Sequence, residues 1–326
     1  MEKRLVLTCL MAIAVGCSGS TPATDSGVTP GNDTGPMVDT GPGPMVDTGP
    51  AAPAVLGCVH SDMTPCTVDL SCLGTATIPA GGAATTATIE VSEYVSMAAV
   101  ADTTIELYTN DMPTGTCASP SCVMGMTDSM GHVDLSAPAG AWVGVHILPS
   151  AGTAEVIAYN QDWPMAAGTT FETAAFSASS ISLVSSLLGR TFQTATAGAI
   201  SGQVNDCTGT HIANAEARVF HGATQVVTGP ASDRTSPRIN GLQGTNPTRS
   251  TLTGDGGTFV GANVPVGDDY HVEIWGTRTA GGTPELIGCE EGRVVAGAIT
   301  VLVTGPLRSD YAAGSPCDRA ATAAGH

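Results

Sequence analysis

The sequence predicts an all-β protein in which tandem antiparallel β-sandwiches follow a disordered tether. Two stretches, 127–147 and 253–274, repeat one pattern: a polar turn, a short strand, a Pro-x-Gly turn, and a strand in which apolar residues alternate. The composition agrees, because only 4% of the residues are aromatic, 41 are glycine, and apolar residues occur in short runs. No motif of a catalytic site accompanies these stretches.

Residues 1–17 form a predicted lipoprotein signal peptide. A basic start is followed by the apolar run Leu5–Val15, which is too short to span a bilayer. The end of this segment, Ala14 to Cys17, resembles a bacterial lipobox. That resemblance implies that Cys17 becomes the first mature residue and carries the lipid, and Ser18 resembles the residue that sorts Gram-negative lipoproteins to the outer membrane. An ordinary secretory signal is the alternative.

Residues 18–56 form the predicted tether. The unit Asp33–Pro42 is repeated almost unchanged by residues 43–50. Proline and glycine at this density, with few large apolar residues, leave too little apolar surface for a fold to form. We therefore expect a disordered linker, rich in Pro, Gly, Asp and Thr, that holds the rest of the chain away from the lipid surface.

Residues 57–190 form the first predicted domain, a β-sandwich that ends in a short helix. Apolar residues recur at helical spacing from Ser179 to Leu188, and Gly189 stands where a glycine ends a helix. This helix is expected to pack one sandwich against the next. The expected strands are 87–91, 103–108, 132–135, 143–147 and 155–159.

Residues 191–308 form the second predicted domain. Its first strand, Ile200–Val204, is followed by expected strands at 217–220, 250–253, 258–262, 270–274 and 298–303. A series of its residues resembles a carboxypeptidase regulatory-like domain: Gly202, Val204, Asp206, Gly209, Ile212, Ala215, Val219, Asp255, Gly256, Phe259, Asn263, Val264, Pro265, Gly267 and Tyr270.

This resemblance implies a fold and no particular function. Domains of that family are transthyretin-like, seven-stranded sandwiches, close to the collagen-adhesin B type and similar to immunoglobulin-like sandwiches, and they serve as spacers, stabilisers and binding modules. Because residues 123–148 carry half of the same motif, the first domain is expected to be a divergent copy. Residues 309–326 are expected to form a C-terminal tail.

The second domain departs from the family pattern at an insertion, His221–Arg249. It holds Arg234 and Arg238 among proline, glycine, asparagine and threonine. A loop of this length inside a small sandwich is either disordered or functional. The sequence leaves both alternatives open: a disordered loop, or a contact surface in which these arginines bind a partner.

The charge is strongly acidic. The net charge is −18, Lys3 is the only lysine, and no lysine or arginine occurs between Leu5 and Gly189. Such a surface repels phosphate, which excludes nucleic acid as a partner. Solubility is the simplest role of this acidity. The expected partners are the membrane, through the lipid anchor, and an envelope polysaccharide or protein.

Export to an oxidising compartment makes disulfide bonds the expected state of the cysteines. The chain has 10 cysteines, and eight remain without Cys9 of the signal and the lipidated Cys17. Zinc is the competing interpretation, which the absence of any Cys-x-x-Cys pair disfavours. The disulfide candidates are Cys58, Cys66, Cys72, Cys117, Cys122, Cys207, Cys289 and Cys317.

Three pairing hypotheses follow from these positions. Cys117 and Cys122 flank a short loop and are expected to pair locally. In the sandwich topology that the family resemblance implies, Cys207 and Cys289 are expected to meet and join the sheets. Five candidates lie in the first domain and three beyond it, so at least one bond must join the two parts if all of them pair. Cys317 is the expected donor of that bond.

No other set of residues predicts chemistry. Asp206 and Asp255 lie in turns at one end of the second domain and are weak calcium candidates, although Asp-Gly is also a common turn dipeptide. Trp275 and Trp142 fall on the face opposite the apolar stripe. They are expected either to form an exposed contact for a sugar or peptide or to pack against a neighbouring domain. His146 points outward without a partner nearby in the sequence, and no hydrolase or phosphate-binding motif occurs. The chain is not expected to be an enzyme or to bind a cofactor or a metal.

These observations together predict a non-catalytic lipoprotein of the outer membrane that acts as a structural, adhesive or spacer module. Two alternatives remain. One is a carbohydrate- or peptide-binding surface module that uses the insertion and Trp275. The other is an accessory domain of a secreted hydrolase complex.

Overall fold

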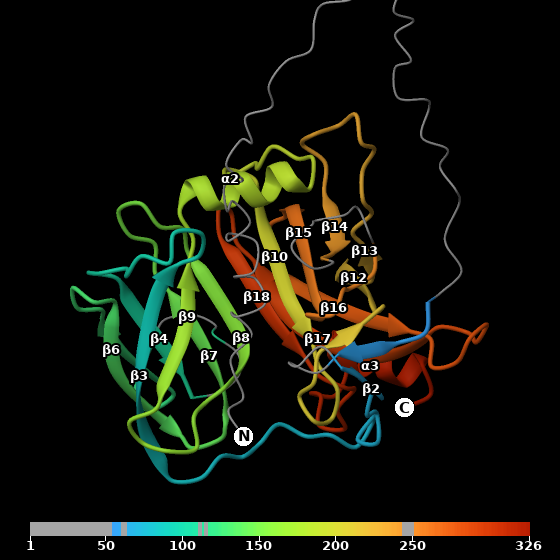
Figure 1. Ribbon diagram of the computed structural model, residues 1–326, viewed down its shortest axis with the longest axis horizontal. Coiled ribbons are helices and arrows are strands. Elements are labelled where there is room, and N and C mark those ends of the chain that lie inside the picture. The colour runs from blue at the N-terminus through green and yellow to red at the C-terminus, as the bar shows by residue number, and fades with distance from the viewer. Residues whose placement is uncertain (1–53, 60–63, 110–112, 114–116, 243–250) are drawn as a thin grey trace, which may run out of the picture.

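The computed structural model describes residues 54–59, 64–109, 113, 117–242 and 251–326 (Figure 1). The predicted signal peptide, Cys17 and nearly all of the predicted tether lie outside these residues. The described chain forms four sheets and only two helices, α2 (Ala178–Leu187) and α3 (Pro316–Ala323). The predicted all-β class is confirmed. Neither of these two helices has the length and apolar character needed to cross a membrane.

The first half of the fold is a β-sandwich. Its strands are β3 (Ala84–Glu93), β4 (Thr104–Tyr108), β5 (Cys122–Met126), β6 (His132–Pro138), β7 (Trp142–Ile147), β8 (Val156–Asp162) and β9 (Thr170–Ala175). A sheet in the order β6-β3-β9 packs against β4, β7 and β8 of a larger sheet. Apolar residues alternate along β3, where Ala87, Ile89 and Val91 are fully buried while Thr88 and Glu90 remain partly exposed.

The second half is a further sandwich. Its strands are β10 (Ala197–Val204), β11 (Ile212–Ala213), β12 (Glu216–His221), β13 (Thr224–Gln225), β14 (Arg238–Gly241), β15 (Thr258–Pro265), β16 (Gly267–Gly276), β17 (Glu285–Val294) and β18 (Ile299–Thr304). A sheet in the order β13-β12-β16-β17 faces β14, β15, β10 and β18. Ile200, Phe259 and Ile274 lie in the core between them.

The two halves share one eight-stranded sheet, in the order β14-β15-β10-β18-β8-β7-β4-β5. β18 pairs in parallel with β8, and Ile299 lies opposite Val156. The sandwiches are therefore continuous. The shared sheet and the β6-β3-β9 sheet are mixed rather than purely antiparallel as predicted, since β10 with β18 and β3 with β9 are parallel as well, whereas the β13-β12-β16-β17 sheet is antiparallel. The pairing leaves neither β8 nor β18 as an open edge that another chain can join.

The N-terminal segment of the described chain lies on the second half. The sequence places residues 57–76 in the first domain, whereas β1 (Gly57–Val59) pairs with β11 on one side and β2 (Pro65–Cys66) on the other. Leu56 and Leu70 pack against the second core. Figure 1 shows the chain then crossing below the molecule to reach β3. The predicted C-terminal tail is ordered around α3, which packs against β16 and β17.

Helix α2 lies where the sequence predicts it, over both halves (Figure 1). The Ser177 side chain caps it by accepting a hydrogen bond from the backbone N–H of Ser180. Gly189 ends it at a positive φ of 69°, a conformation that favours glycine. Ile181 packs into the first core and Leu188 packs against β15 of the second half. The expected packing between the sandwiches is therefore present.

The other expected strands coincide with observed ones, with one exception. Of the predicted strand 250–253, residue 250 lies outside the described residues, and the rest contributes one isolated bridge at Leu252. The strands that the sequence analysis missed include β5, β9, β14 and β17. The longest of these, β17, proves important because it forms one wall of a cavity.

Candidate functional site

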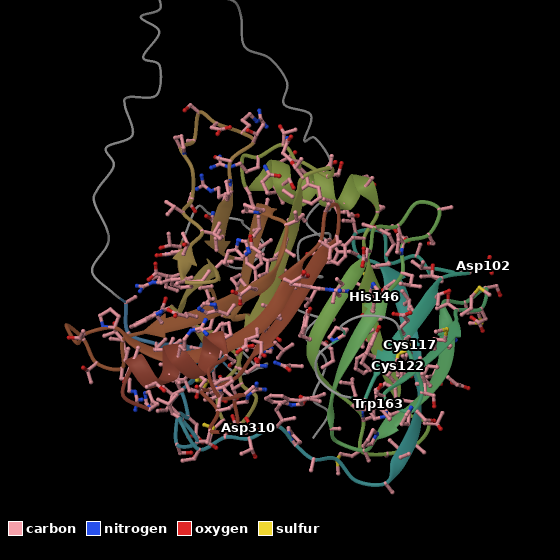
Figure 2. The ribbon with its side chains drawn as sticks, turned by 180° about the vertical axis from the view of Figure 1, so that it is seen from behind. Asp102, Cys117, Cys122, His146, Trp163 and Asp310 are labelled. Carbon is pink, nitrogen blue, oxygen red and sulfur yellow. A yellow bond between two sulfur atoms is a disulfide. The ribbon has the colours of Figure 1, made fainter. Side chains whose placement is uncertain are left out.

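Disulfide bonds join all eight candidate cysteines in four pairs. The bonds are Cys58–Cys66, Cys72–Cys207, Cys117–Cys122 and Cys289–Cys317. The local pair between Cys117 and Cys122, on the first half (Figure 2), is the one that the sequence predicts. A bond between the two parts of the sequence also exists, but Cys72 rather than Cys317 provides it.

The predicted pair of Cys207 with Cys289 is wrong. Cys207 follows β10, and its backbone N–H donates to the carbonyl of Asp69 at 2.9 Å, which brings Cys72 of the N-terminal segment within bonding distance. Cys289 lies in the middle of β17 and packs on the outer side of that strand against α3, which carries Cys317. Cys207 thus lies in the turn after one strand and Cys289 within a strand of another sheet, and the two face different neighbours.

The insertion is ordered over residues 221–242, and residues 243–249 lie outside the described part. A buried guanidinium holds it: Arg190, 1% exposed, donates from Nε to the carbonyl of Ser236 at 2.9 Å and from Nη2 to that of Gly229 at 2.8 Å. Arg238 lies in β14 and donates to Asn240. Of the two predicted contact arginines, Arg234 is exposed and Arg238 is half-buried.

The two tryptophans are packing residues in this structure. Trp275 lies under the guanidinium of Arg218, 4.7 Å from the ring centre, donates its Nε1–H to Glu273, and packs against the cluster around α3. Trp142 lies under the guanidinium of Arg308, at 5.4 Å. Of the two alternatives in the sequence, the packing contact is the one observed, and Trp275 does not form an exposed platform for a sugar.

The two calcium candidates do not meet in a metal site. The carboxylate of Asp206 is buried and accepts hydrogen bonds from the backbone N–H groups of Asp69, Thr208 and Thr210. It therefore stabilises the turn after β10 and the segment before Cys72. Asp255 is exposed in a separate turn. No group of three or more metal-ligating side chains occurs among the described residues.

A cluster that the sequence analysis missed lies where the two halves meet. His146 of β7 is 7% exposed, and its ring nitrogens lie 2.8 Å from Glu106 Oε2 and 2.8 Å from Glu155 Oε1. Tyr108 donates its hydroxyl to Glu106 at 3.0 Å. Figure 2 shows His146 at the boundary between the strands of the first half and those of the second. The side chain is absent from the first core, as predicted, but it is buried between the carboxylates of Glu106 and Glu155 rather than exposed.

The electrostatics of this cluster follow from burial and from its paired charges. Burial opposes the charged form of His146, but hydrogen bonds to Glu155 and Glu106 outweigh it and raise the pKa of the imidazole above its ordinary 6.5. The hydrogen bond from His146 holds the pKa of Glu155 below its ordinary 4.5. Burial, together with the bond to Glu106, raises the pKa of Tyr108 to about 12. Arg293 of β17 lies close enough to act electrostatically on both Glu155 and Tyr108.

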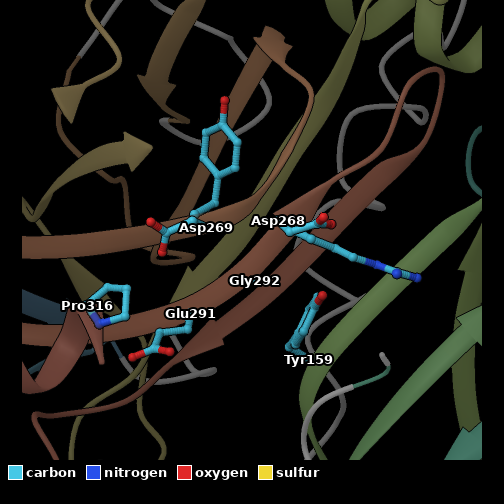
Figure 3. A pocket seen from close by; sticks show the side chains of 8 residues that line it. Tyr159, Asp268, Asp269, Glu291, Gly292 and Pro316 are labelled. Carbon is cyan, nitrogen blue, oxygen red and sulfur yellow. The ribbon is translucent and has the colours of Figure 1, made fainter. Parts of the chain in front are cut away.

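A cavity of about 340 Å³ opens next to this cluster (Figure 3). Strand β8 of the first half contributes Tyr159, and strands β16 and β17 and helix α3 of the second half contribute the rest. Three of the lining side chains are carboxylates and one is a guanidinium, so the cavity is acidic overall. The lining residues are Tyr159, Asp268, Asp269, Tyr270, Glu291, Gly292, Arg293 and Pro316.

Comparisons with known proteins place the chain in no family. No family model matches the sequence, and no curated protein matches it. The β-sandwich that the carboxypeptidase regulatory-like resemblance implies is therefore present, whereas membership of that family stays a prediction. Among solved structures, a streptococcal ancillary pilin is 12% identical with a TM-score of 0.23, and the match covers 68% of this chain and 62% of the pilin. The chain thus spans less than two thirds of that protein.

Two further pilins are similar at the same level. The shaft pilin SpaA of Lactobacillus rhamnosus GG is 9% identical with a TM-score of 0.21, over 69% of this chain and 98% of the pilin. The minor pilin GBS52 of Streptococcus agalactiae is 8% identical with a TM-score of 0.19, over 70% of this chain and 98% of the pilin. Likenesses at these TM-scores assign no function.

Proposed function

We propose that this protein is a lipid-anchored module of the bacterial outer membrane with a structural or adhesive role rather than a catalytic one. The observation that carries the proposal is the set of four disulfide bonds. Bonds of this number in one chain are typical of proteins exported to an oxidising compartment. They attach both the N-terminal segment and the C-terminal helix to the second half, which produces one covalently closed body.

The sequence before this body supports anchoring. The lipobox-like residues ending at Cys17 precede a Pro- and Gly-rich segment, and the described body begins only at residue 54. Several acyl chains on one cysteine hold a protein at a membrane, whereas a single chain does so only marginally, at about 0.8 kcal/mol per buried CH₂ group. The body is therefore presented to an envelope polysaccharide or protein at the end of a spacer.

The test is lipid labelling in a Gram-negative host. The wild-type chain is expected to incorporate radiolabelled palmitate and to fractionate with outer membranes, and Cys17→Ser is expected to lose both properties. Cys9→Ser, a matched change inside the predicted signal peptide, is the control and should behave as wild type. Recovery of unlabelled wild-type protein in the soluble periplasm would overturn the anchored assignment.

A further inference from the structure

Strand β5 ends the shared eight-stranded sheet and has an unpaired edge. It pairs with β4 on one side and with no strand of the described chain on the other. The backbone N–H of Thr127, just after β5, donates across this pair to the carbonyl of Thr103. Because backbone groups alternate in direction along a strand, the N–H and C=O groups of Met124 and Met126 point away from β4. None of these groups has a hydrogen-bond partner in the described part of the chain.

The usual protection of an edge strand is absent from β5. Edge strands of soluble proteins carry charged residues, proline or bulges, because unpaired backbone groups attract another strand. The edge strands β6, β9, β14 and β17 each contain charged residues, among them Asp134, Glu172, Arg238 and Glu291. Strand β5 contains neither charge nor proline, and its register with β4 is unbroken. Of the described edge strands longer than two residues, β5 alone is uncharged.

Two exposed methionine side chains flank this open edge. Met124 is 55% exposed and Met126 is 62% exposed. They lie opposite Glu106 and Thr104 of β4, and therefore on the face of the sheet that points away from the first core. Glu106 is their charged neighbour across the pair, but its side chain is only 11% exposed and its carboxylate lies 2.8 Å from the ring of His146. The surface beside the edge is therefore apolar.

We propose that β5 pairs in antiparallel fashion with β5 of a second copy of this chain, across a two-fold axis at Gly125. Met124 of each copy then lies opposite Met126 of the other. Each of these two pairs exchanges two N–H···O=C bonds, so the unpaired backbone groups of both methionines are all used. An axis at Met124 would instead place Met126 against Cys122, whose N–H already donates to the carbonyl of Ala118 at 3.0 Å.

The edge is complementary to its own copy in both side chains and charge. Opposite residues of an antiparallel pair have Cβ atoms about 4.5–5.5 Å apart on the same face of the sheet. Met124 and Met126 of the two copies therefore cover one another, and flexible methionine side chains adapt to such a contact. With a net charge of −18, two copies repel each other over most of their surfaces. An uncharged edge is where they can approach, and a two-fold axis closes the assembly at a dimer.

The experiment is analytical ultracentrifugation of residues 18–326, which contain the whole described body without the predicted signal peptide. Salt at about 0.15 M screens the repulsion between acidic copies. The wild type is expected to dimerise as its concentration rises to about 1 mM, the order that a short flexible tether imposes on neighbours. Met126→Lys, which places a charge on the edge, should weaken the dimer about tenfold. Met165→Lys makes the same change at a methionine that is 77% exposed outside β5, and should leave the dimer unchanged.

Amide exchange locates the interface. The N–H groups of Met124 and Met126 are free in one copy and bonded in the dimer, so their exchange should slow as the protein concentration rises. The N–H of Asp134 also points away from its partner strand, β3, and is the control whose exchange should not change. Met124→Pro removes an N–H that a single copy leaves unpaired, and proline is tolerated on edge strands. This variant should keep the circular dichroism of the wild type and lose the dimer.

Three results would overturn the proposal. They are a wild type that stays monomeric at the highest concentration, an equal weakening of the dimer by Met126→Lys and Met165→Lys, and a dimer in which the Met124 and Met126 amides exchange as fast as in the monomer. The last result would mean that the copies meet through another surface. The proposal goes beyond the envelope role described above and does not depend on a lipid at Cys17. Its failure would leave the outcome of the palmitate experiment untouched.

Discussion

Ile299 of β18 lies directly opposite Val156 of β8, in parallel register, and this pairing carries one sheet from the first half of the protein to the second. Each half also contributes to the core of the other. Ile157 and Tyr159 of β8 belong to the second core, and Ala199 of β10 and Ile299 belong to the first. Separation of the halves therefore exposes apolar side chains from both cores to water.

The two halves are expected to unfold together. Scanning calorimetry of the oxidised protein should show a single transition, with a calorimetric enthalpy equal to the van't Hoff enthalpy. Two resolved transitions would mean that the shared sheet does not couple the sandwiches.

A substitution in the first half should destabilise the second. Ile157 is fully buried in the second core although it lies on β8, so Ile157→Ala is expected to lower the free energy of unfolding by about 2–5 kcal/mol. Leu183→Ala, on the exposed side of α2, is the control, since that residue is 43% exposed. The change is measured by denaturant titration with amide exchange followed in β10 and β16. Exchange that accelerates only in the first half would contradict the shared core.

The bond Cys72–Cys207 is expected to stabilise the fold more than Cys117–Cys122. The first closes a separation of 135 residues and the second closes 5. By chain entropy the longer loop contributes about 5 kcal/mol and the shorter about 2 kcal/mol. Double serine variants of each pair, compared by denaturant titration, test this order. A reversed order would show that the long loop does not restrict the unfolded chain.

Arg190 is expected to hold the insertion in place. Arg190→Ala leaves the carbonyls of Gly229 and Ser236 without their donor, at a cost of about 2–4 kcal/mol. Limited proteolysis should then cut within residues 222–242. Arg234→Ala is the control: it removes an exposed side chain and keeps the backbone carbonyl of residue 234, which accepts hydrogen bonds from Thr191 and Asn263. The insertion of this control should stay protected, and equal cleavage of both variants would rule out a specific role for Arg190.

The cluster around His146 is expected to stabilise the fold most strongly between about pH 4.5 and 6.5. The pKa of His146 is raised by its carboxylate partners, so its contribution is complete below 6.5 and is lost as pH rises through the raised value. The pKa of Glu155 is lowered, so its contribution is complete above 4.5 and is lost as pH falls through the lowered value. Both contributions are present in the window between these two values.

His146→Gln has a neutral side chain at every pH and should abolish the part of this dependence that arises from the imidazole. His132→Gln is the matched control, since the His132 side chain is 33% exposed. Denaturant midpoints measured from pH 4 to 9 give the profile. If the wild type and His146→Gln have parallel profiles, the cluster does not couple protonation to folding.

Regular alternation made most of the fold predictable, and polar residues concealed β17, the strand that forms one wall of the cavity. Strands such as β3, β7 and β16 have apolar residues at every second position and were predicted. In β17, Glu290, Glu291 and Arg293 interrupt the apolar pattern, and Gly288 and Gly292 resemble turn residues. Two of the charged residues that line the cavity, Glu291 and Arg293, are therefore among those that hid the strand.

The site itself depends on contacts between distant parts of the sequence. His146 and Glu106 are separated by 40 residues, and Arg293 acts on their neighbours Tyr108 and Glu155 from the other half of the chain. The count of cysteines did predict a bond between the two parts. It did not identify Cys72 as the donor, because the docking of residues 54–76 on the second half depends on the pairing of β1 with β11.

The covalent attachment of the N-terminal segment determines how the body responds to mechanical load. Tension along the chain first reaches the bridge between Val55 and Thr277. It then reaches β1, which is held to β11 by a two-residue ladder, and finally the Cys72–Cys207 bond. Hydrogen-bonded strands peel apart under forces that leave a covalent bond intact. Only the residues before Cys72 can then be extended. The Cys58–Cys66 bond shortens the extended length of that segment, because the residues between these two cysteines stay in a closed loop. A pull between residue 54 and the second half is thus expected to extend the segment before Cys72 by a fixed amount while the sandwich stays folded.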